Sequence, residues 1–486
     1  MHTAADIQEV AKLTQTVHEH AIVLGASMAG LLAARVLADG YDRVTIVDRD
    51  DLDADTERRR GTPQAQHIHA LLARGEQALE QLFPGLTEEL VEHGAPVGDL
   101  LADARVLFNG HRFARTTAGV PLVSVSRPLL ENRVRARARV RALAPVRIAP
   151  PSDVVGLQSS PDRRGITGVR VLRHADGSAE EMLHADLVVD ATGRGSRTPK
   201  WLEALGHGRP EQEQLQIDVG YATRRYRLPT GALNDDLACV HGHTPDQPRG
   251  GALAKLENNV YMLTLFGLLG DHPPRDADGF TAWARTLRFP DLADAIVDGE
   301  PIDDPVTYRF TADTRRRYER MRTLPDGLLV IGDALCSFNP IYGQGMTAAA
   351  LQALALQRAL PIDRAGTRRI VTALACAVDV PWQLATAADL AVPEVKGPRP
   401  PKLRLLNAYM ARLQAAAATD AELARAFLRV TGLVDRPQSL LRPSIAGRVL
   451  RAHAAGNRPA PARQTVRRSR PRSHRRAHGD ARTPIR

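Results

Sequence analysis

One glycine-containing turn in the sequence has residue types and spacing that are typical of pyrophosphate binding. In AIVLGASMAG, Gly25 and Gly30 fill the first and last positions of a G-x-G-x-x-G pattern, and Ser27 takes the middle position. Glycine in the middle lets the backbone approach a pyrophosphate closely, and serine is the next smallest choice, with a hydroxyl that can donate to phosphate. Asp48 lies 18 residues after Gly30, where a carboxylate can accept hydrogen bonds from a ribose.

The helix that follows this turn strengthens the interpretation. Its first free N–H groups and the positive end of its dipole point at the same place as the glycines. We therefore expect the start of this helix and the end of the next strand to contact a dinucleotide, through Met28, Ala29 and Arg49.

A second glycine turn, almost 300 residues later, decides between NAD and FAD. In GLLVIGDALCSFNPIYGQGM a strand ends at Gly332 and Asp333, and a glycine-containing loop leads into a new helix. An aspartate at a strand end can accept hydrogen bonds from a ribityl chain, and a helix start can hold the carbonyl edge of a flavin. A simple NAD dehydrogenase has no use for this second site, so FAD is the predicted cofactor. The loop residues expected to touch it are Pro340, Gly343, Gly345 and Met346.

The elements that must position these turns can be read from periodicity. Residues 20–25 form a buried strand, 27–40 a helix with apolar residues at steps of three and four, and 42–50 a β-branched strand, which together make one βαβ unit. Another helix is predicted over 126–143, and a hairpin-like pair over 164–191.

The hydrophobic pattern is different in the second half of the chain. Residues 211–310 alternate apolar and polar side chains, as a half-exposed antiparallel sheet does. Residues 327–333 return to a buried strand, 345–360 form an alanine-rich helix, and 370–450 are predicted to be helical.

Five ordered stretches resemble the flavin-dependent monooxygenases of the para-hydroxybenzoate hydroxylase fold, and are most similar to bacterial polyether epoxidases and related actinobacterial-type flavin monooxygenases. They are GASMAG, RRRGTPQAQHIHALL, SRPLLENRVR, DLVVDATGRGSR and GDALCSFNPIYGQGM, within roughly residues 20–400. The resemblance implies an α/β fold: a Rossmann-type, glutathione reductase-like FAD-binding domain, an antiparallel β-sheet substrate domain and C-terminal helices.

The resemblance also implies a division of the chain. The FAD-binding domain takes residues 20–210 and returns over 311–360, with the GD motif. The substrate-binding sheet occupies 211–310, the C-terminal helical region 361–456, and a disordered basic tail 457–486.

Further contacts with the flavin are implied by the matched motifs. They are Gly61 and Gln64 of the loop, Arg127 of the predicted helix, and Thr192 and Gly193 in place of the family's DG motif. Here Asp190 and Gly193 are separated by two residues, whereas the family motif has aspartate and glycine adjacent. This departure leaves the electron donor open between direct use of NAD(P)H and delivery by a separate flavin reductase.

Several conspicuous residues have simpler interpretations. His67 and His69 are two residues apart and do not share a helix face, so a polar lining beside the flavin or a surface position is expected rather than a metal site. Cys336 is expected to be a small core residue. Arg58, Arg59 and Arg60 are expected to be half solvated.

The distribution of charge along the chain limits which partners the protein is expected to bind. The net charge of +10 is concentrated in residues 457–486, which contain ten arginines and one acid, so the rest of the chain is close to neutral. No nucleic acid is therefore expected on the folded body, and the tail is either a solvated extension or a contact for an anionic partner. No secretory signal, transmembrane run or cysteine framework is predicted, which indicates a cytoplasmic protein without a metal.

Three functions remain open. The first is an FAD-dependent monooxygenase that uses O2 and a flavin C4a-hydroperoxide to epoxidise or hydroxylate an apolar, polyketide- or terpene-like metabolite. Aromatic residues are only 4% of the chain, which does not favour a stacking pocket for a small phenol. The others are an FAD-dependent reductase or dehydrogenase of isoprenoid-like substrates, and a non-catalytic flavin-binding protein. The W-x-W-x-I-P element of flavin halogenases does not occur.

Overall fold

A five-stranded parallel sheet carries the first turn in the computed structural model of the chain, which describes residues 18–52, 59–140, 146–175, 177–360 and 366–456. The predicted tail, residues 457–486, lies outside the described residues. The strand order is β18-β11-β1-β2-β7. The strands are β1 (His18–Leu24), β2 (Tyr41–Val47), β7 (Val146–Ile148), β11 (Leu187–Asp190) and β18 (Leu328–Val330).

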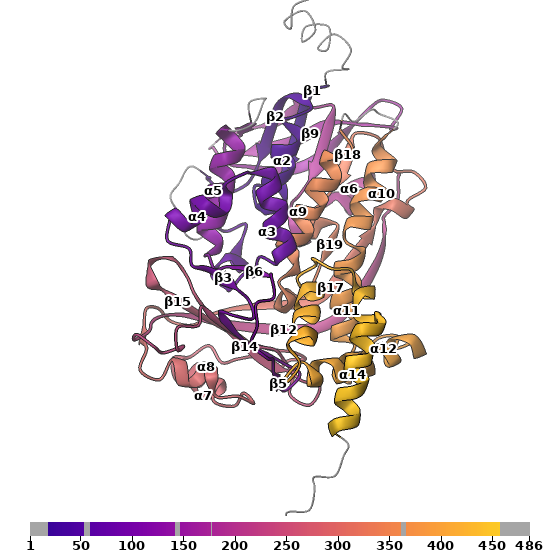
Figure 1. The fold of residues 1–486 in the computed structure, drawn as a ribbon. Helices are drawn as coiled ribbons and strands as arrows, with labels where there is room; N and C mark the ends of the chain where they lie inside the picture. The colour runs from indigo at the N-terminus through magenta and orange to yellow at the C-terminus, as the bar shows by residue number, and fades with distance from the viewer. Residues whose placement is uncertain (1–17, 53–58, 141–145, 176, 361–365, 457–486) are drawn as a thin grey trace, which may run out of the picture.

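The predicted βαβ unit is confirmed. Helix α2 (Met28–Leu37) joins β1 to the parallel strand β2, and buries the predicted face that contains Leu31, Ala34 and Leu37. It packs against α5 (Arg127–Val140) and α9 (Gln344–Gln357), and α9 also contacts α3 (Ala73–Leu82) (Figure 1). The first and last predicted motifs therefore lie on neighbouring helices.

The hairpin prediction over 164–191 is right in its first part and wrong in its last. Strands β9 (Ile166–Arg173) and β10 (Glu180–His184) are antiparallel and continue into β8 (Ser152–Ser159). Residues 187–190 instead form β11 of the parallel sheet, because all four are buried, as a strand covered on both faces requires.

A nine-stranded sheet forms the other half of the molecule. It contains the expected strands of 211–310, and in addition takes β4 from the first part of the chain and extends β17 to Arg317. The pair β13–β4 is parallel, so the sheet is mixed rather than purely antiparallel. The strands are β4 (Ala104–Phe108), β5 (His111–Arg112), β12 (Glu211–Arg227), β13 (Ala238–His241), β14 (Arg249–Lys255), β15 (Tyr261–Gly267), β16 (Glu300–Pro301), β17 (Val306–Arg317) and β19 (Cys336–Ser337).

Successive side chains of β15 point to opposite sides of this sheet, so its two faces have different surroundings. Leu263 and Leu265 pack in one apolar cluster with Phe280 and Trp283 of α7 (Ala277–Ala284). The residues between them point to the opposite face, because side chains alternate along a strand. The sheet therefore has one face covered by helices and one face free to line a cavity.

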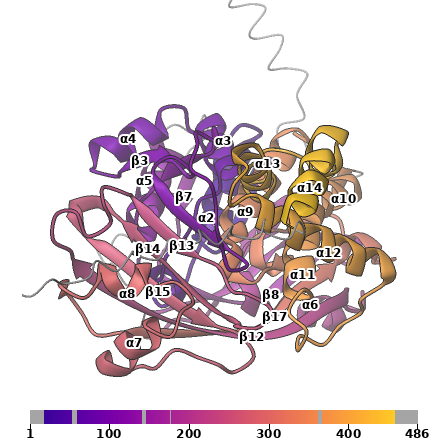
Figure 2. The same cartoon turned by 60° about the horizontal axis from the view of Figure 1, so that its bottom comes forward.

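The predicted C-terminal helices lie beside the nine-stranded sheet (Figure 2). Phe427 of this region contacts Phe108 and Phe113, with ring centroids 5.6 and 5.4 Å apart respectively, which joins the helices to β4 and the loop after β5. The helices are α10 (Thr367–Ala377), α11 (Asp379–Asp389), α12 (Pro401–Ala416), α13 (Ala421–Thr431) and α14 (Pro443–Gly456).

One helical stretch, Thr367–Asp389, is long and apolar enough to cross a membrane by length and composition alone, although the sequence predicted none. In the structure it consists of α10 and α11, and Ile370, Val371 and Leu374 are buried in the main core. Core helices pass the same test, so this is weak evidence for a span.

Two buried carboxyl groups join α11 to β17. Asp313 and Asp389 are fully buried side by side, and neither Asp313 oxygen accepts a hydrogen bond of normal geometry from the described residues. Asp389 Oδ1 accepts hydrogen bonds from Asn339 Nδ2 at 2.7 Å and from the Tyr342 hydroxyl at 2.8 Å. Burial, together with the neighbouring carboxyl group of Asp389, raises the pKa of Asp313 to about 10, and burial also raises the pKa of Asp389. Asp313 is therefore protonated at neutral pH.

This arrangement predicts a specific effect of pH on stability. Asp313 stays protonated in the folded protein at neutral pH, but ionises near pH 4 in the unfolded chain. The folded state therefore binds more protons between about pH 4 and 10, and the free energy of unfolding falls as the pH rises through this window. Asp313→Asn keeps a donor for Asp389 and removes the titration, so thermal melting should exceed that of the wild type at pH 9 by about 2 °C or more.

The advantage of D313N should shrink toward pH 5, where the wild-type carboxyl is protonated at little cost. Asp304→Asn, at an exposed carboxylate, is the matched control and should leave the pH dependence of melting unchanged. Equal pH profiles for D313N and the wild type would contradict a protonated Asp313 in the folded state.

Candidate functional site

The carboxyl ends of three parallel strands bring three sequence motifs to one edge. Leu24 of β1 pairs with Asp190 of β11, and Asp190 pairs with Val330 of β18. The turns that follow these strands therefore start side by side. Ligands of open α/β sheets bind at such an edge.

In the turn after β1, backbone atoms pack so closely that two positions have no room for a side chain. Gly25 has φ +96°, and a Cβ there would lie 2.7 Å from the Ala191 carbonyl oxygen. A Cβ on Gly30 would lie 1.8 Å from the Gly25 carbonyl oxygen. Helix α2 consequently starts directly at the strand end, with its N-terminus at the cavity, where it favours a negatively charged group.

The Asp48 carboxylate is fixed at the end of β2. Its Oδ2 accepts a hydrogen bond from the Ala26 backbone N–H at 2.6 Å, and its Oδ1 accepts one from the Asp50 N–H at 2.8 Å. Arg59 Nη2 lies 3.2 Å from Oδ2. The predicted ribose contact is therefore held by backbone groups and by one cation.

Arg59 is a member of the site that the sequence analysis missed. It was expected to be half solvated, but only 9% of its side chain is exposed, and it forms ion pairs with Asp48, Asp50 and Glu131. Of its neighbours, Arg60 is exposed and Arg58 lies outside the described residues. Two of these carboxylates follow β2, and the third, Glu131, comes from α5, 72 residues after Arg59, so no local pattern indicates the complete cluster.

Glu131 links Arg59 to the predicted residue Arg127. Arg127 Nε donates to Glu131 Oε2 at 3.0 Å, and Arg127 Nη2 donates to the Ser27 hydroxyl at 2.9 Å. The Ser27 hydroxyl in turn lies 3.3 Å from Glu131 Oε2, so it is oriented by this pair. The spacing of Arg127 and Glu131, four residues apart on a helix, is the one signal that could have found this cluster.

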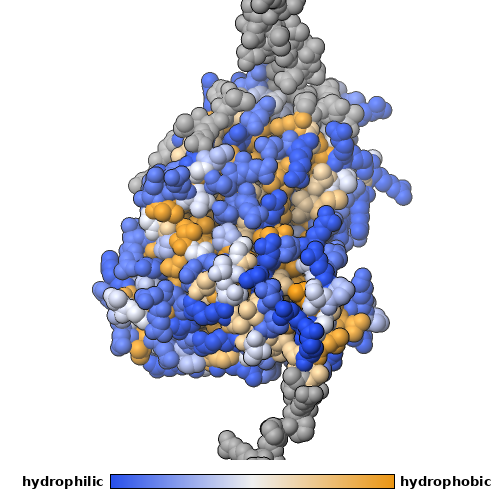
Figure 3. Space-filling view, viewed as in Figure 1, coloured by the Kyte–Doolittle hydropathy of each residue, from blue (hydrophilic) through white to orange (hydrophobic). Residues whose placement is uncertain are grey.

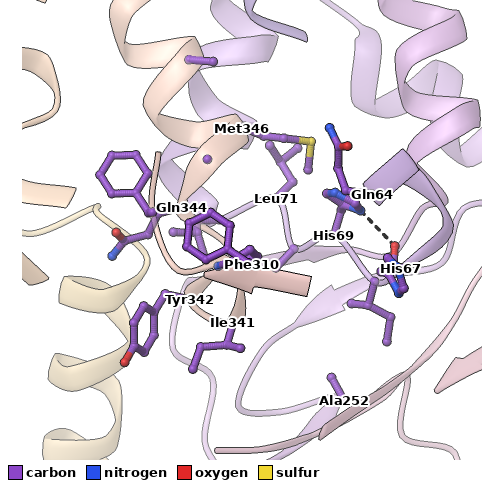
Figure 4. Close-up of a pocket in the computed structure, with 18 of the residues that line it drawn as sticks. Gln64, His67, His69, Leu71, Ala252, Phe310, Ile341, Tyr342, Gln344 and Met346 are labelled. Carbon is purple, nitrogen blue, oxygen red and sulfur yellow. Dashed lines mark hydrogen bonds between the residues drawn. The ribbon is translucent and has the colours of Figure 1, made fainter. Parts of the chain in front are cut away.

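The loop before α3 lines the centre of the cavity. The Gly61 N–H donates to Asp50 Oδ2 at 2.8 Å, and Gln64 faces the cavity beside His69 (Figure 4). His67 is buried, and its Nδ1 lies 2.7 Å from the Thr223 hydroxyl. Burial lowers the pKa of His67 to about 4 and that of His69 to about 3, so both rings are neutral at pH 7.

The second glycine turn forms the opposite wall. Gly332 has φ +60°, and its N–H donates to Gln352 Oε1 of α9 at 2.8 Å. Burial raises the pKa of Asp333, although Arg194, Arg127 and Arg316 oppose this shift. A half-buried carboxyl group that lines a cavity offers an acceptor to a hydroxyl-bearing ligand.

The start of α9 closes this wall. Gly343 has φ +66°, and a Cβ there would lie 2.7 Å from Ala70 Cβ. A Cβ on Gly345 would meet only Asp333 Oδ1, at 3.9 Å, so the space above Gly345 is open. Pro340 and Met346 line the same space, and Figure 4 shows the side chain of Met346 at the start of α9.

In the segment after β11, which takes the place of the DG motif, the aspartate and the glycine have separate roles. The Asp190 carboxylate is fully buried and accepts hydrogen bonds from the Thr192 N–H and from three hydroxyl groups, those of Thr192, Ser196 and Thr198. These bonds satisfy the carboxylate internally. Thr192 and Gly193 instead face the cavity with their own atoms.

All predicted cofactor residues except Gly30 line one cavity of about 1060 Å³. Gly30 lies beneath the turn, in contact with Gly25. Typical pockets for one small ligand span about 300–1,000 Å³, so this cavity is at the upper limit of that range. The members on the cavity wall are Gly25, Ser27, Met28, Ala29, Asp48, Arg49, Gly61, Gln64, Arg127, Thr192, Gly193, Gly332, Asp333, Pro340, Gly343, Gly345 and Met346.

The cavity continues away from the parallel sheet into an apolar space. Its floor is the free face of the nine-stranded sheet, with Ala238, Ala252, Ala254 and Met262. Its cover comes from the C-terminal helices, whose lining residues include Leu384, Met410, Phe427 and Leu440. These helices therefore cover the pocket, which the sequence left open.

Five residues of the cavity wall each have a buried polar atom without a hydrogen-bond partner among the described residues. The atoms are His67 Nε2, Tyr221 Oη, His241 Nδ1, His243 Nδ1 and Gln344 Oε1. Buried polar atoms are normally hydrogen-bonded, so unpaired ones on a cavity wall indicate where ligand atoms bind. The glycine cradle, Asp333 and these groups fit a flavin nucleotide with a substrate beside it.

Comparison with known proteins identifies the family. The family described as FAD binding domain matches residues 19–388. The chain is 36% identical to the protein Rv3254 of Mycobacterium tuberculosis over 453 residues, which are 89% of this chain and 93% of the relative. It is 28% identical to kynurenine 3-monooxygenase of Salinispora arenicola over 361 residues, or 68% of this chain and 70% of the relative.

Solved structures agree with the predicted fold class. The flavin-dependent brominase Bmp2 has a TM-score of 0.61 at 14% identity, covering 90% of this chain and 100% of its own. The p-nitrophenol 4-monooxygenase PnpA of Pseudomonas putida has a TM-score of 0.60 at 17% identity, covering 86% and 99%. These likenesses confirm the fold, and the family match confirms the predicted cofactor. The chain belongs to the FAD-binding family of flavin-dependent monooxygenases; it is an oxidoreductase, and FAD is its cofactor.

Proposed function

We propose that the chain inserts one oxygen atom from O2 into an apolar metabolite, by epoxidation or hydroxylation. One observation carries the proposal: a single cavity joins the glycine turns of the cofactor edge to an apolar space between the nine-stranded sheet and the C-terminal helices. A substrate in that space would lie directly beside a flavin held by the turns.

We propose the following positions for the cofactor. The adenosine and pyrophosphate lie along the start of α2, held by the turn from Gly25 to Gly30 and by Asp48, Arg49 and Arg127. The ribityl chain lies against Asp333. The flavin ring lies between the loop of Gly61 and Gln64, the segment of Thr192 and Gly193, and the turn before α9.

FAD, once reduced, supplies the chemistry that activates O2. The protein positions the cofactor and the substrate, provides the electrostatic environment of the reaction, and excludes water. The N-terminus of α9, opened by Gly343, presents free backbone N–H groups that favour negative charge at this place. The apolar cover from the C-terminal helices keeps water from the reacting atoms.

The shape and polarity of the cavity favour an elongated apolar substrate with an oxygen-bearing end. Alanines on the floor leave width for a chain or a fused ring, while His67, Tyr221 and Gln344 of the cavity wall each have a polar atom without a partner among the described residues. His67 is neutral at pH 7, so it can exchange a hydrogen bond with a substrate hydroxyl or carbonyl without bringing a charge. Polyketide- and terpene-like molecules have this form, as do the substrates of the polyether epoxidases that the motifs resemble.

The electron donor is part of the proposal. Electrons come from NAD(P)H, either directly or through a flavin reductase. Because Asp190 is saturated by its own segment, it offers no acceptor to a second nucleotide. The assay below therefore contains an arm for each donor.

Replacement of Asp333 tests the cofactor position. Asp333→Ala removes the acceptor proposed for the ribityl hydroxyls, and a hydrogen bond to a charged group of this kind corresponds to about a 10- to 100-fold change in affinity. We expect the FAD dissociation constant of D333A, measured by fluorescence titration of the apoprotein, to rise by about this factor.

Asp333→Asn, which keeps one carbonyl acceptor, should recover part of the affinity. Asp326→Ala is the matched control, because Asp326 is exposed and lies just before the same strand. Wild-type affinity in D333A would remove Asp333 from the cofactor site.

An oxygen-labelling experiment tests the reaction. FAD-loaded protein is supplied with labelled O2, a panel of polyene and terpene substrates, and either NADPH alone or NADPH with a flavin reductase. We expect a product with one labelled oxygen atom. A product that gains hydrogen without label would indicate the reductase instead, and the absence of any product with either donor would favour a non-catalytic flavin protein.

Ala252→Trp gives this experiment a structural control. Ala252 lies on the cavity floor of β14, away from the glycine turns (Figure 4), so the larger side chain should abolish oxygenation of long substrates while FAD content stays unchanged. Ala408→Trp, on the exposed side of α12, should leave both unchanged. Full activity of A252W on long substrates would contradict the proposed substrate space.

A further inference from the structure

Charge is unevenly distributed between the body of the molecule and the helices that cover the cavity. Residues 396–456 contain eleven lysines and arginines but three acids, whereas residues 1–395 contain 44 and 51 respectively. The covering helices therefore carry a net positive charge on a body of net negative charge. The near-neutral net charge of residues 1–456 hides this asymmetry.

The three acids of this region are already neutralised. Asp420 pairs with Arg448 at 2.9 Å, Glu422 with Arg425 at 3.1 Å, and Asp435 with Arg429 at 2.8 Å. Other cations here are exposed and form no ion pair within the described part of the chain: Lys402, Arg404, Arg412, Arg436 and Arg451. The surface thus offers free positive charge to an anionic partner.

Large apolar side chains lie on the same surface. Leu405, Leu441 and Leu450 are 74%, 56% and 61% exposed, and Leu406 is 37% exposed. Helices α12 and α14, which carry three of these leucines, pack together beside the segment of Leu441 (Figure 2). In Figure 3, hydrophobic and strongly hydrophilic surface adjoin over this region, at the lower right.

Two of these leucines connect the surface to the cavity. Leu406 and Leu441 are exposed and also line the cavity wall, as does the exposed residue Ala411. The cavity therefore opens between α12 and the segment before α14. Two leucines thus lie at the mouth of the apolar space, and cations without an ion pair among the described residues lie on the helices α12 and α14.

We infer that this surface, defined by Leu405, Leu406, Leu441 and Leu450 with their neighbouring cations, docks on an anionic lipid bilayer. Exposed leucines partition into the boundary between headgroups and acyl chains, and lysines and arginines around them bind anionic headgroups. Nucleic acid would account for the cations but not for the leucines. Beyond α14 the sequence continues with ten arginines and one acid, so it too has a net positive charge.

Docking in this orientation places the cavity mouth against the bilayer. An apolar molecule dissolved in the membrane then reaches the cavity without crossing water. The inference concerns the surface and does not depend on the oxygenation reaction, because binding to vesicles is measured without any substrate.

Vesicle sedimentation tests the inference on the full FAD-loaded chain. We expect binding to vesicles of phosphatidylcholine with 30% phosphatidylglycerol, and at least about tenfold weaker binding to pure phosphatidylcholine. The double variant Leu405→Asp, Leu450→Asp should weaken binding to the anionic vesicles by about tenfold or more. Val297→Asp is the matched control, since Val297 is 64% exposed outside this surface, and it should change binding by less than about twofold.

A second pair, Leu405→Ser with Leu450→Ser, removes the apolar contact without adding charge and should also weaken binding. FAD content and melting temperature of every variant confirm that the protein is folded. The inference is overturned if both leucine pairs bind as the wild type does while deletion of 457–486 abolishes binding, because the tail would then be the sole contact. It is equally overturned if no vesicle binds, including the case in which an acidic protein binds this surface instead.

Discussion

The parallel register of β1, β11 and β18 is the constraint on which the site depends. Hydrogen bonding aligns Leu24, Asp190 and Val330, so three turns from distant parts of the chain start at one edge. A shift of one residue would turn the side chains of a strand to its other face and displace the turn that follows. The buried apolar runs of these strands hold the register, because each is covered on both faces.

Buried charged and ionisable groups fix the segments at both ends of the cavity. Arg59 is enclosed by three carboxylates, and Glu131 connects it to Arg127 and Ser27. At the other end, Asp389 holds the turn before α9 through Asn339 and Tyr342, beside the protonated Asp313. Both groups cost solvation energy on folding, which the ion pairs of Arg59 and the hydrogen bonds of Asp389 offset in part. The cofactor edge and the substrate space are thus positioned by interactions that need the complete fold.

The features that depend on a local sequence pattern could be predicted from the sequence. The turn at Gly25, the acid at Asp48, the second turn at Gly343 and the elements around them could be read from spacing and periodicity. The Arg59–Glu131 cluster and the Asp313–Asp389 pair could not, because their partners are far apart in the chain. The strand at 187–190 was assigned to the hairpin, since a short apolar run does not reveal whether it pairs locally or joins a parallel sheet.

The floor of the cavity has a consequence for how this protein can diversify. On the strands β13 to β15, the side chains that hold the core, such as Leu253, Leu263 and Leu265, alternate with small ones that face the substrate, such as Ala238 and Ala252. Changes in the second set reshape the pocket without removing a core contact. Selection can therefore alter which molecules the enzyme accepts one methyl group at a time, while the scaffold keeps its stability and its hold on the cofactor.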